Sequence, residues 1–380
     1  MWPLCTCTRS ASLAGPNATA FPVKIRGTAQ NDPTKSFSGT YDLQRPGLLL
    51  MDGVVYAALR RHCDTGSYYG WVAGVSTSGQ LRALWVARAN GSGAGIWQSG
   101  GGIVSDGPGR ILLVTGNRGA PVPPIPGSTP PPDLGQSTVR LQVQADGTLK
   151  ASDFFAPYDA STLDSWDADF GSGGPVALPS QYFGNQAHPH LFVGVGKQGY
   201  VYLLDRDDLG GSGMGANGSD QVIQRIGPYG GVWSRPGVWP GDGGYVYIPT
   251  ASSGTTPGGS SGHLEVYHYG IDGSGKPTLA HVATSGDSFG FGSGAPVVTS
   301  NGTSSGSAIV WLIWRRMGAA AAHSCARTRR SHRAGRRGCW PASPSARPPS
   351  SCRRASLATR SSSGRATGTS CALALRSTCP

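Results

Sequence analysis

The chain has few charged side chains and no long helical pattern. Asp, Glu, Lys and Arg account for 14% of its 380 residues, whereas glycine occurs 59 times and proline 29 times. Glycine and proline interrupt helices and favour turns, so this composition predicts short strands joined by many turns rather than a helical protein. The length suits one large β domain or a fragment of one.

Long apolar runs are also missing. No segment reaches the roughly 18 apolar residues that a membrane-spanning helix requires, so we expect no membrane span. Residues 1–20 lack the apolar core of a secretory signal peptide. The sequence therefore shows no recognisable export signal.

Acidic residues are absent from the C-terminal part of the chain. Residues 315–380 hold fourteen of the 32 Lys and Arg residues and no Asp or Glu, although the whole chain carries a formal net charge of +12. The preceding residues are consequently close to neutral. A basic chain often binds nucleic acid, but here only the tail supports that interpretation.

Cysteine is nearly absent from the patterned body of the chain. Only Cys63 lies between residues 21 and 314, and the other seven of the eight cysteines lie near the two ends. An even number of cysteines can indicate a disulfide framework, but this distribution argues against one. No two cysteines are adjacent in the sequence.

The basic tail, residues 315–380, has the composition of a disordered segment, rich in Arg, Ser, Ala and Pro and without a periodic apolar pattern. A change of reading frame restores such a pattern. When degenerate codons are read from the third base, residues 360–374 permit the strand-like Val-Val-Val-Gly-Ala-Arg-Asp-Gly-His-Val-Leu-Arg-Phe-Gly, and residues 4–10 give a weaker version of this result. We predict that residues 1–20 form an irregular, out-of-frame N-terminus and that the tail is out of frame and disordered. The alternative is a genuine basic tail that binds nucleic acid.

The body, residues 21–314, repeats one pattern. Short runs of Val, Ile, Leu and Tyr alternate with Gly, Pro, Asp and Ser turns, in units of about 50 to 75 residues. Each unit opens with small residues, as expected for the innermost strand of a propeller blade beside a crowded axis. The openings are residues 45–50, 97–104, 170–177, 233–238 and 291–298.

Further strands follow each opening. Second strands are predicted at residues 54–57, 110–114, 191–195, 245–248 and 309–313. Third strands are predicted at residues 71–75, 139–143, 200–205 and 264–267, and outer strands at 81–86, 149–155, 222–226 and 279–282. The sequence therefore predicts an all-β propeller of four-stranded antiparallel blades, with four whole blades and parts of two or three more. The propeller is predicted to be incomplete.

Several repeats resemble a known family. Gly199–Asp205 and Gly53–Ala57 are similar to the Gly-x-Val-Tyr-x-x-Asp core of pyrroloquinoline quinone (PQQ)-type propeller repeats, and Gly95–Gly102 and Asp169–Ala177 resemble exported bacterial members of that superfamily. The resemblance implies an extracellular or periplasmic location for the intact protein. In this family an outer-strand tryptophan often docks neighbouring blades, and Trp85 matches that position.

The resemblance also suggests a ligand site at the axial mouth. Quinoprotein dehydrogenases of the superfamily hold PQQ over a calcium ion, with a carboxylate base, a stacking tryptophan and commonly a vicinal cysteine pair, which this chain lacks. The aromatic side chains in the openings are candidates for stacking a planar ligand, and two aspartates are candidate oxygen ligands for a cation. The candidate residues are Trp97, Asp167, Asp169, Phe170, Trp233 and Phe291. The competing interpretation, which we favour, is that the aromatics fill the axis and the carboxylates cap turns.

Other motifs do not have the context that their chemistry needs. Gly194–Gly199 matches a dinucleotide-binding pattern, but a strand follows it instead of a helix. His188 and His190 resemble a metal-binding pair, yet no further ligand lies nearby in the sequence, so a surface turn is the better interpretation. Asp205–Gly210 is acidic but lacks the ligand spacing of a calcium loop, and we expect a turn at a blade edge.

The sequence therefore favours a non-catalytic propeller that serves as a binding or scaffold domain of an exported bacterial protein. Its expected partner is a small molecule or a protein at the propeller face, and not nucleic acid. The alternative is a PQQ- and calcium-dependent alcohol or sugar dehydrogenase. The sequence assigns no catalytic residue, no metal site and no established cofactor, because fold resemblance alone does not assign activity.

Overall fold

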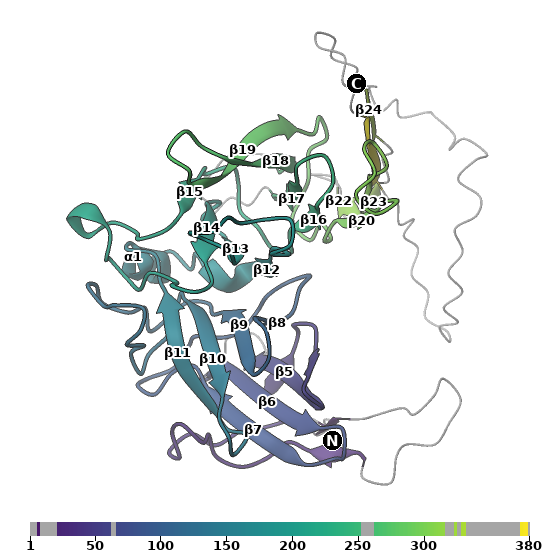
Figure 1. The fold of residues 1–380 in the computed structure, drawn as a ribbon. Coiled ribbons are helices and arrows are strands. Elements are labelled where there is room, and N and C mark those ends of the chain that lie inside the picture. The colour runs from purple at the N-terminus through teal and green to yellow at the C-terminus, as the bar shows by residue number, and fades with distance from the viewer. Residues whose placement is uncertain are drawn as a thin grey trace.

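The computed structural model describes residues 6–7, 21–61, 66–251, 262–315, 323–324, 328–331 and 373–378. Strands dominate this part of the chain (Figure 1). Its one α-helix within the described residues is the six-residue α1 (Ala160–Ser165), accompanied by the short 3-10 turns η2 (Phe170–Ser172) and η3 (Ala216–Gly218). The predicted all-β class is confirmed. None of the described helices is long and apolar enough to span a membrane.

Four antiparallel sheets follow one another along the chain, and we number them as blades one to four. Blade one contains β3 (Asp42–Gln44), β4 (Leu49–Met51), β5 (Val54–Arg61), β6 (Trp71–Ser76) and β7 (Leu81–Val86). Blade two contains β8 (Val104–Ser105), β9 (Arg110–Val114), β10 (Thr138–Val143) and β11 (Leu149–Phe155). Blade three contains β12 (Val176–Ala177), β13 (Leu191–Val195), β14 (Val201–Asp205) and β15 (Gln224–Ile226). Blade four contains β16 (Gly237–Trp239), β17 (Tyr245–Pro249), β18 (Leu264–Ile271) and β19 (Pro277–Thr284).

The strands agree closely with the sequence prediction. The predicted second strands of blades two and three, and the predicted outer strands of blades one and two, have the same bounds in the structure. β18 and β19 are longer than predicted, because they form a hairpin whose pairing continues to Ile271 and Pro277 at the turn. Cross-strand pairing of this kind extends a strand past its apolar pattern.

A fifth sheet begins with β20 (Val297–Thr299) and β21 (Ile309–Leu312). Its other strands come from the predicted tail: β25 (Leu373–Thr378) pairs antiparallel with β21, and β24 (Thr328–Ser331) pairs parallel with β25. Two further sheets have two antiparallel strands each. One pairs β1 (Thr6–Cys7) with β2 (Val23–Lys24), and the other pairs β22 (Trp314–Arg315) with β23 (His323–Ser324). Where the sequence predicts a disordered tail, the described residues are thus short strands. The rest of residues 315–380 lies outside the described part of the chain, and disorder there stays a prediction.

The core lies between neighbouring blades. Side chains alternate along each strand, so a strand contributes residues to both of its neighbours. In β9, Ile111 and Leu113 belong to the cluster shared with blade one, whereas Leu112 and Val114 belong to the cluster shared with blade three. Trp85 is buried in the cluster between blades one and two, as its predicted docking position requires.

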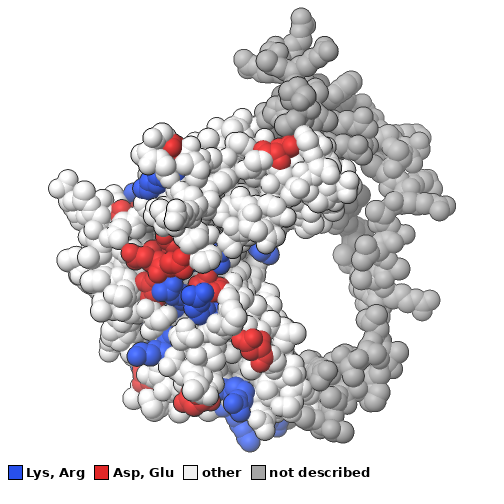
Figure 2. All heavy atoms as spheres, in the orientation of Figure 1, with Lys and Arg blue, Asp and Glu red and all other residues white. Residues whose placement is uncertain are grey.

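The innermost segments approach one another closely at the axis, where the sequence predicts small residues. A Cβ atom on Gly101 would lie 3.0 Å from the Cα atom of Gly174, and one on Gly102 would lie 2.6 Å from the carbonyl oxygen of Gly47. Only glycine permits such distances between backbones. The described residues curve around a central hollow (Figure 2).

Candidate functional site

The carboxylate of Asp169 lies at the centre of a polar cluster formed with the loops that follow β9 and β13. It precedes η2 and is only 4% exposed. Its oxygens pair with the Lys197 ammonium at 2.5 Å and accept a hydrogen bond from the Asn117 backbone N–H at 2.7 Å. Burial raises the pKa of Asp169, and the Lys197 ammonium opposes that shift.

Lys197 also holds the second candidate carboxylate. Its Nζ donates to Oδ2 of Asp167 at 3.0 Å and to the Asp167 carbonyl oxygen at 2.7 Å. Burial lowers the pKa of Lys197, but the combined effect of the Asp169 and Asp167 carboxylates in raising it is larger, so the pKa lies above its usual value. Lys197 therefore stands as a fixed positive charge between the two carboxylates.

These contacts decide whether a calcium ion fits. Calcium needs several oxygen ligands directed at one point. Here the ammonium of Lys197 already neutralises Asp167 and Asp169, and the Asn117 side-chain amide also donates to Asp167. Within the described residues, no group of three or more His, Cys, Asp or Glu side chains is arranged to hold a metal ion. The residues present do not fit calcium at this position.

Trp97 lies beside this cluster and is half-buried. The guanidinium carbon of Arg60 is 3.9 Å from its ring centroid, so one face of the indole already carries a cation. The indole Nε1 is buried and has no hydrogen-bond partner among the described residues. A planar ligand would have to use the remaining face or accept a hydrogen bond from this N–H.

Gly116 permits the indole and the carboxylate to lie together. A Cβ atom at this position would be 2.8 Å from Cδ1 of Trp97 and closer still to Oδ1 of Asp169. Contacts this short do not occur between real side chains, so any other residue would displace one of the two groups.

The remaining aromatic candidates have separate positions. Phe170 is 3% exposed and packs edge-on against Tyr202 at 5.3 Å, in the core between blades two and three. Trp233 and Phe291, from the openings of blade four and the fifth sheet, form an edge-to-face pair with centroids 5.2 Å apart. Phe291 is 53% exposed, so this pair offers an apolar surface to solvent.

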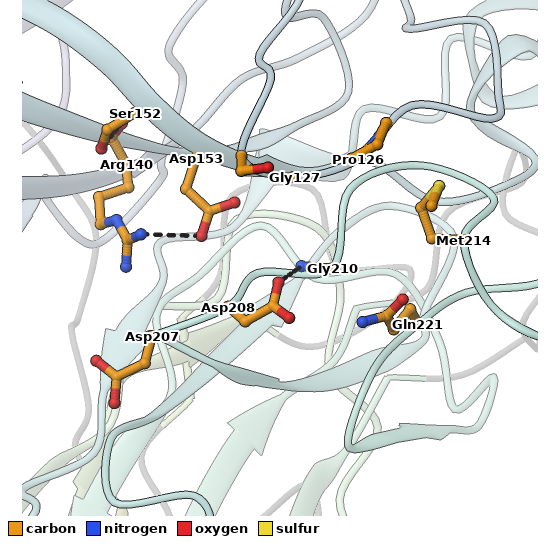
Figure 3. A pocket seen from close by; sticks show the side chains of 11 residues that line it. Pro126, Gly127, Arg140, Ser152, Asp153, Asp207, Asp208, Gly210, Met214 and Gln221 are labelled. Atoms are coloured by element: carbon orange, nitrogen blue, oxygen red, sulfur yellow. Dashed lines mark hydrogen bonds and ion pairs between the residues drawn. The ribbon is translucent and has the colours of Figure 1, made fainter.

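A cavity of about 350 Å³ lies apart from this cluster, at the outer edge between blades two and three (Figure 3). Asp153 and Arg140 line it and form an ion pair at 3.1 Å. Asp208 accepts a hydrogen bond from the Gly210 backbone N–H, and Asp207 pairs with His190 Nδ1 at 2.7 Å. The acidic turn at 205–210 does lie at a blade edge, as the sequence predicts.

Sequence reasoning missed this outer cavity because three distant segments form it. They are the proline-rich insertion near Pro126, the hairpin β10–β11 and the loop after β14. The role of Lys197 was missed for the same reason, since the carboxylates it holds lie about thirty positions earlier in the chain. The signal available was a lone basic residue in an otherwise glycine-rich turn.

No family model matches the chain, and no curated protein matches it. Among solved structures, a quinohemoprotein alcohol dehydrogenase from Pseudomonas putida HK5 is similar over 79% of this chain and 58% of its own, with 11% identity and a TM-score of 0.42. A soluble aldose sugar dehydrogenase from Escherichia coli matches 80% of this chain and 85% of its own, with 11% identity and a TM-score of 0.40.

A quinohemoprotein alcohol dehydrogenase from Comamonas testosteroni matches 74% of this chain, with 13% identity and a TM-score of 0.40. The chain spans 58% of the length of each quinohemoprotein alcohol dehydrogenase. Similarity at this level carries no information about activity.

Proposed function

We propose that residues 21–314 form a non-catalytic, PQQ-like propeller that binds a ligand or a protein at its axial mouth, within an exported bacterial protein. One observation carries the proposal: Lys197 neutralises both candidate carboxylates, Asp167 and Asp169, at 3.0 and 2.5 Å. A carboxylate held in this way serves poorly as a general base or as a calcium ligand. The exposed Phe291 beside Trp233, and the unpartnered Nε1 of Trp97, support binding at the mouth.

Calcium titration tests this proposal directly. We expect the full chain to show no saturable heat of calcium binding below about 10 mM, because the ammonium occupies the position between the carboxylates. The variant Lys197→Met removes the ammonium and is expected to gain calcium affinity, seen as binding at about 1 mM or as a rise in Tm with added calcium.

Lys24→Met is the matched control for this titration. Lys24 is exposed, in β2, and its replacement removes the same charge away from the mouth. Tight calcium binding by the unaltered chain, with no gain in Lys197→Met, would contradict the proposed role of Lys197.

The alternative function is a PQQ- and calcium-dependent alcohol or sugar dehydrogenase. The neighbouring Trp97 and Asp169 favour it, because an aromatic ring and a carboxylate lie together beside Gly116. Incubation with PQQ and calcium, followed by alcohol or aldose and a dye acceptor, distinguishes the two functions. Dye reduction that disappears in Asp169→Asn would favour the enzyme, whereas PQQ-independent binding without dye reduction would favour the binding domain.

We also propose that residues 1–20 and 315–380 are out of frame and that the intact protein is extracellular or periplasmic. The abrupt rise in arginine after Trp314, with fourteen arginines in residues 315–380 and none in residues 236–314, supports the first part of this proposal. Resequencing the gene across the codons for Trp314 and Arg315, and reading upstream of Met1, tests it. A missing or extra base is the expected result, and an intact frame would restore nucleic acid as a partner for the tail.

A further inference from the structure

The openings of blades one, two and four line a cavity that contains two arginines and no acidic residue. The cavity has a volume of about 410 Å³. Arg45 and Arg235 line it, together with Leu48 and the glycine-rich opening of blade two, Gly100–Val104. The aliphatic part of Arg235 reaches across the axis, since Cβ atoms on Gly101 and Gly174 would both lie about 3.2 Å from the Arg235 Cβ.

The two guanidinium groups lack a counter-ion in the described part of the chain. No carboxylate there lies within 4.0 Å of either group. The contact that the structure gives the Arg45 guanidinium is with the Trp97 ring, at 5.8 Å from the centroid. Burial alone lowers the pKa of Arg45 and of Arg235, with no neighbouring carboxylate to offset it. A buried guanidinium without a carboxylate partner is stabilised when an anion binds beside it.

The repeat makes this pair unusual. In blade three and the fifth sheet, the residue before the proline of the opening is small: Gly174 precedes Pro175, and Ala295 precedes Pro296. In blade four the same position holds Arg235, before Pro236. In blade one Arg45 precedes Pro46, but it lies four residues before its inner strand β4 rather than two. Small residues suffice to fill the axis, so packing does not require arginine at either position.

We infer that this cavity, called here the arginine cavity, binds a small oxyanion bearing a carboxylate or phosphate group, held by Arg45 and Arg235. A guanidinium presents parallel N–H donors that match the two oxygens of such a group, and a charge-assisted contact of this kind is about twice as strong as a neutral one. The glycines of blade two leave room for the anion beside the arginine side chains.

This inference goes beyond the proposed function and does not depend on it. The arginine cavity is lined by Arg45 and Arg235, whereas the cluster around Asp169 is built on Lys197 and its two aspartates. The two sites meet at Trp97, whose ring the Arg45 guanidinium contacts, but calcium binding depends on Lys197 and the two aspartates. Calcium binding can therefore fail while anion binding succeeds, and the reverse also holds.

Calorimetric titration of the full chain with inorganic phosphate and, separately, with succinate tests the inference at low ionic strength. We expect saturable binding of at least one anion below about 10 mM, weakened by added sodium chloride. Binding of phosphate alone indicates a phosphate ligand, and binding of succinate alone indicates a carboxylate ligand. Either result supports the arginine cavity, and absence of both overturns it.

Charge-removing variants locate the binding. Arg45→Gln and Arg235→Gln are each expected to weaken anion binding about tenfold, the equivalent of about 1.4 kcal/mol. Arg26→Gln removes the same charge from an exposed position outside the cavity and is expected to leave affinity within about twofold of the original. Equal affinity in all three variants would overturn the assignment.

A tethered carboxylate gives a test that keeps both arginines. Leu48 lines the cavity and is 61% exposed, so Leu48→Glu should fold and supply an internal anion to the guanidinium groups. We expect Leu48→Glu to lose phosphate and succinate binding by at least about tenfold, and Leu48→Gln to retain both. Undiminished binding by Leu48→Glu would place the anion elsewhere and overturn the inference.

Discussion

At the residue scale, the candidate site depends on close packing that leaves no room for an additional side-chain atom. Asp169, Trp97 and Lys197 occupy one small volume, and Gly116 provides the space for it. The sequence identified Trp97 and Asp169 as candidates from the openings of the repeats. It did not identify Lys197 or Gly116, because their importance comes from contacts made by strands that are distant in sequence.

Gly116 offers a direct test of this crowding. The variant Gly116→Ala is expected to lower the free energy of unfolding by about 1–3 kcal/mol, because its Cβ has no space beside Trp97 and Asp169. Urea denaturation followed by tryptophan fluorescence measures the loss. Gly273→Ala is the control, since a Cβ there meets nothing within 4 Å. Equal stability of the two variants would show that the candidate site is less crowded than described.

Asp42 predicts a specific dependence of stability on pH. Burial raises the pKa of this carboxyl to about 6, against the opposing effects of a hydrogen bond from the Ser38 N–H and the charge of Arg61. The folded state therefore holds a proton that the unfolded state loses between about pH 4 and pH 6, and stability falls as the pH rises through this range.

Asp42→Asn removes this titration. At neutral pH we expect the free energy of unfolding of the variant to exceed that of the original protein by about 1–2 kcal/mol. Near pH 4 this difference should vanish. Urea denaturation at both pH values measures it. A constant difference across the range would show that Asp42 titrates normally.

At the element scale, most strands follow from the sequence because their signals are local. Short runs rich in apolar residues between polar and glycine-rich turns fix the ends of strands such as β7, β9, β11 and β13. The strands that are clearly longer than predicted gain length from pairing, β18 and β19 with each other and β5 with β3 and β6. The outer cavity follows from no local signal, because its walls come from three segments.

The two faces of β9 predict a pattern of energetic coupling. Leu112 and Phe192 share a buried cluster, whereas Leu113 faces blade one. Double-mutant cycles of alanine variants should therefore give a coupling energy of about 0.5–3 kcal/mol for Leu112 with Phe192 and near zero for Leu113 with Phe192. Denaturation of the single and double variants provides the measurement. Similar coupling for both pairs would contradict the assignment of faces.

At the scale of the whole molecule, large apolar side chains remain exposed on blade one and on the fifth sheet. Leu48 and Leu50 are 61% and 66% exposed beside and within β4, and Val297 is 60% exposed in β20. Exposed apolar surface of this kind favours association between molecules.

We expect the full chain to self-associate as its concentration rises, as measured by sedimentation velocity. Leu50→Lys combined with Val297→Lys should reduce that association, because each substitution places a charge in the exposed apolar surface. Val122→Lys is the control, as Val122 is 75% exposed but lies in the proline-rich insertion. Monomeric behaviour of the original chain at every concentration would contradict this expectation.

Because successive side chains of a strand pack against opposite neighbouring sheets, the fold has a defined pattern of unfolding. Each main cluster joins two successive sheets, so cooperativity passes from neighbour to neighbour, as in a one-dimensional row of coupled units. Amide hydrogens in blade three, the central sheet of the five, should exchange most slowly, and those of the fifth sheet should exchange fastest. In such a row the fraying of an end sheet costs less than opening the centre, and the axial sites are lost in the order of the sheets that hold them.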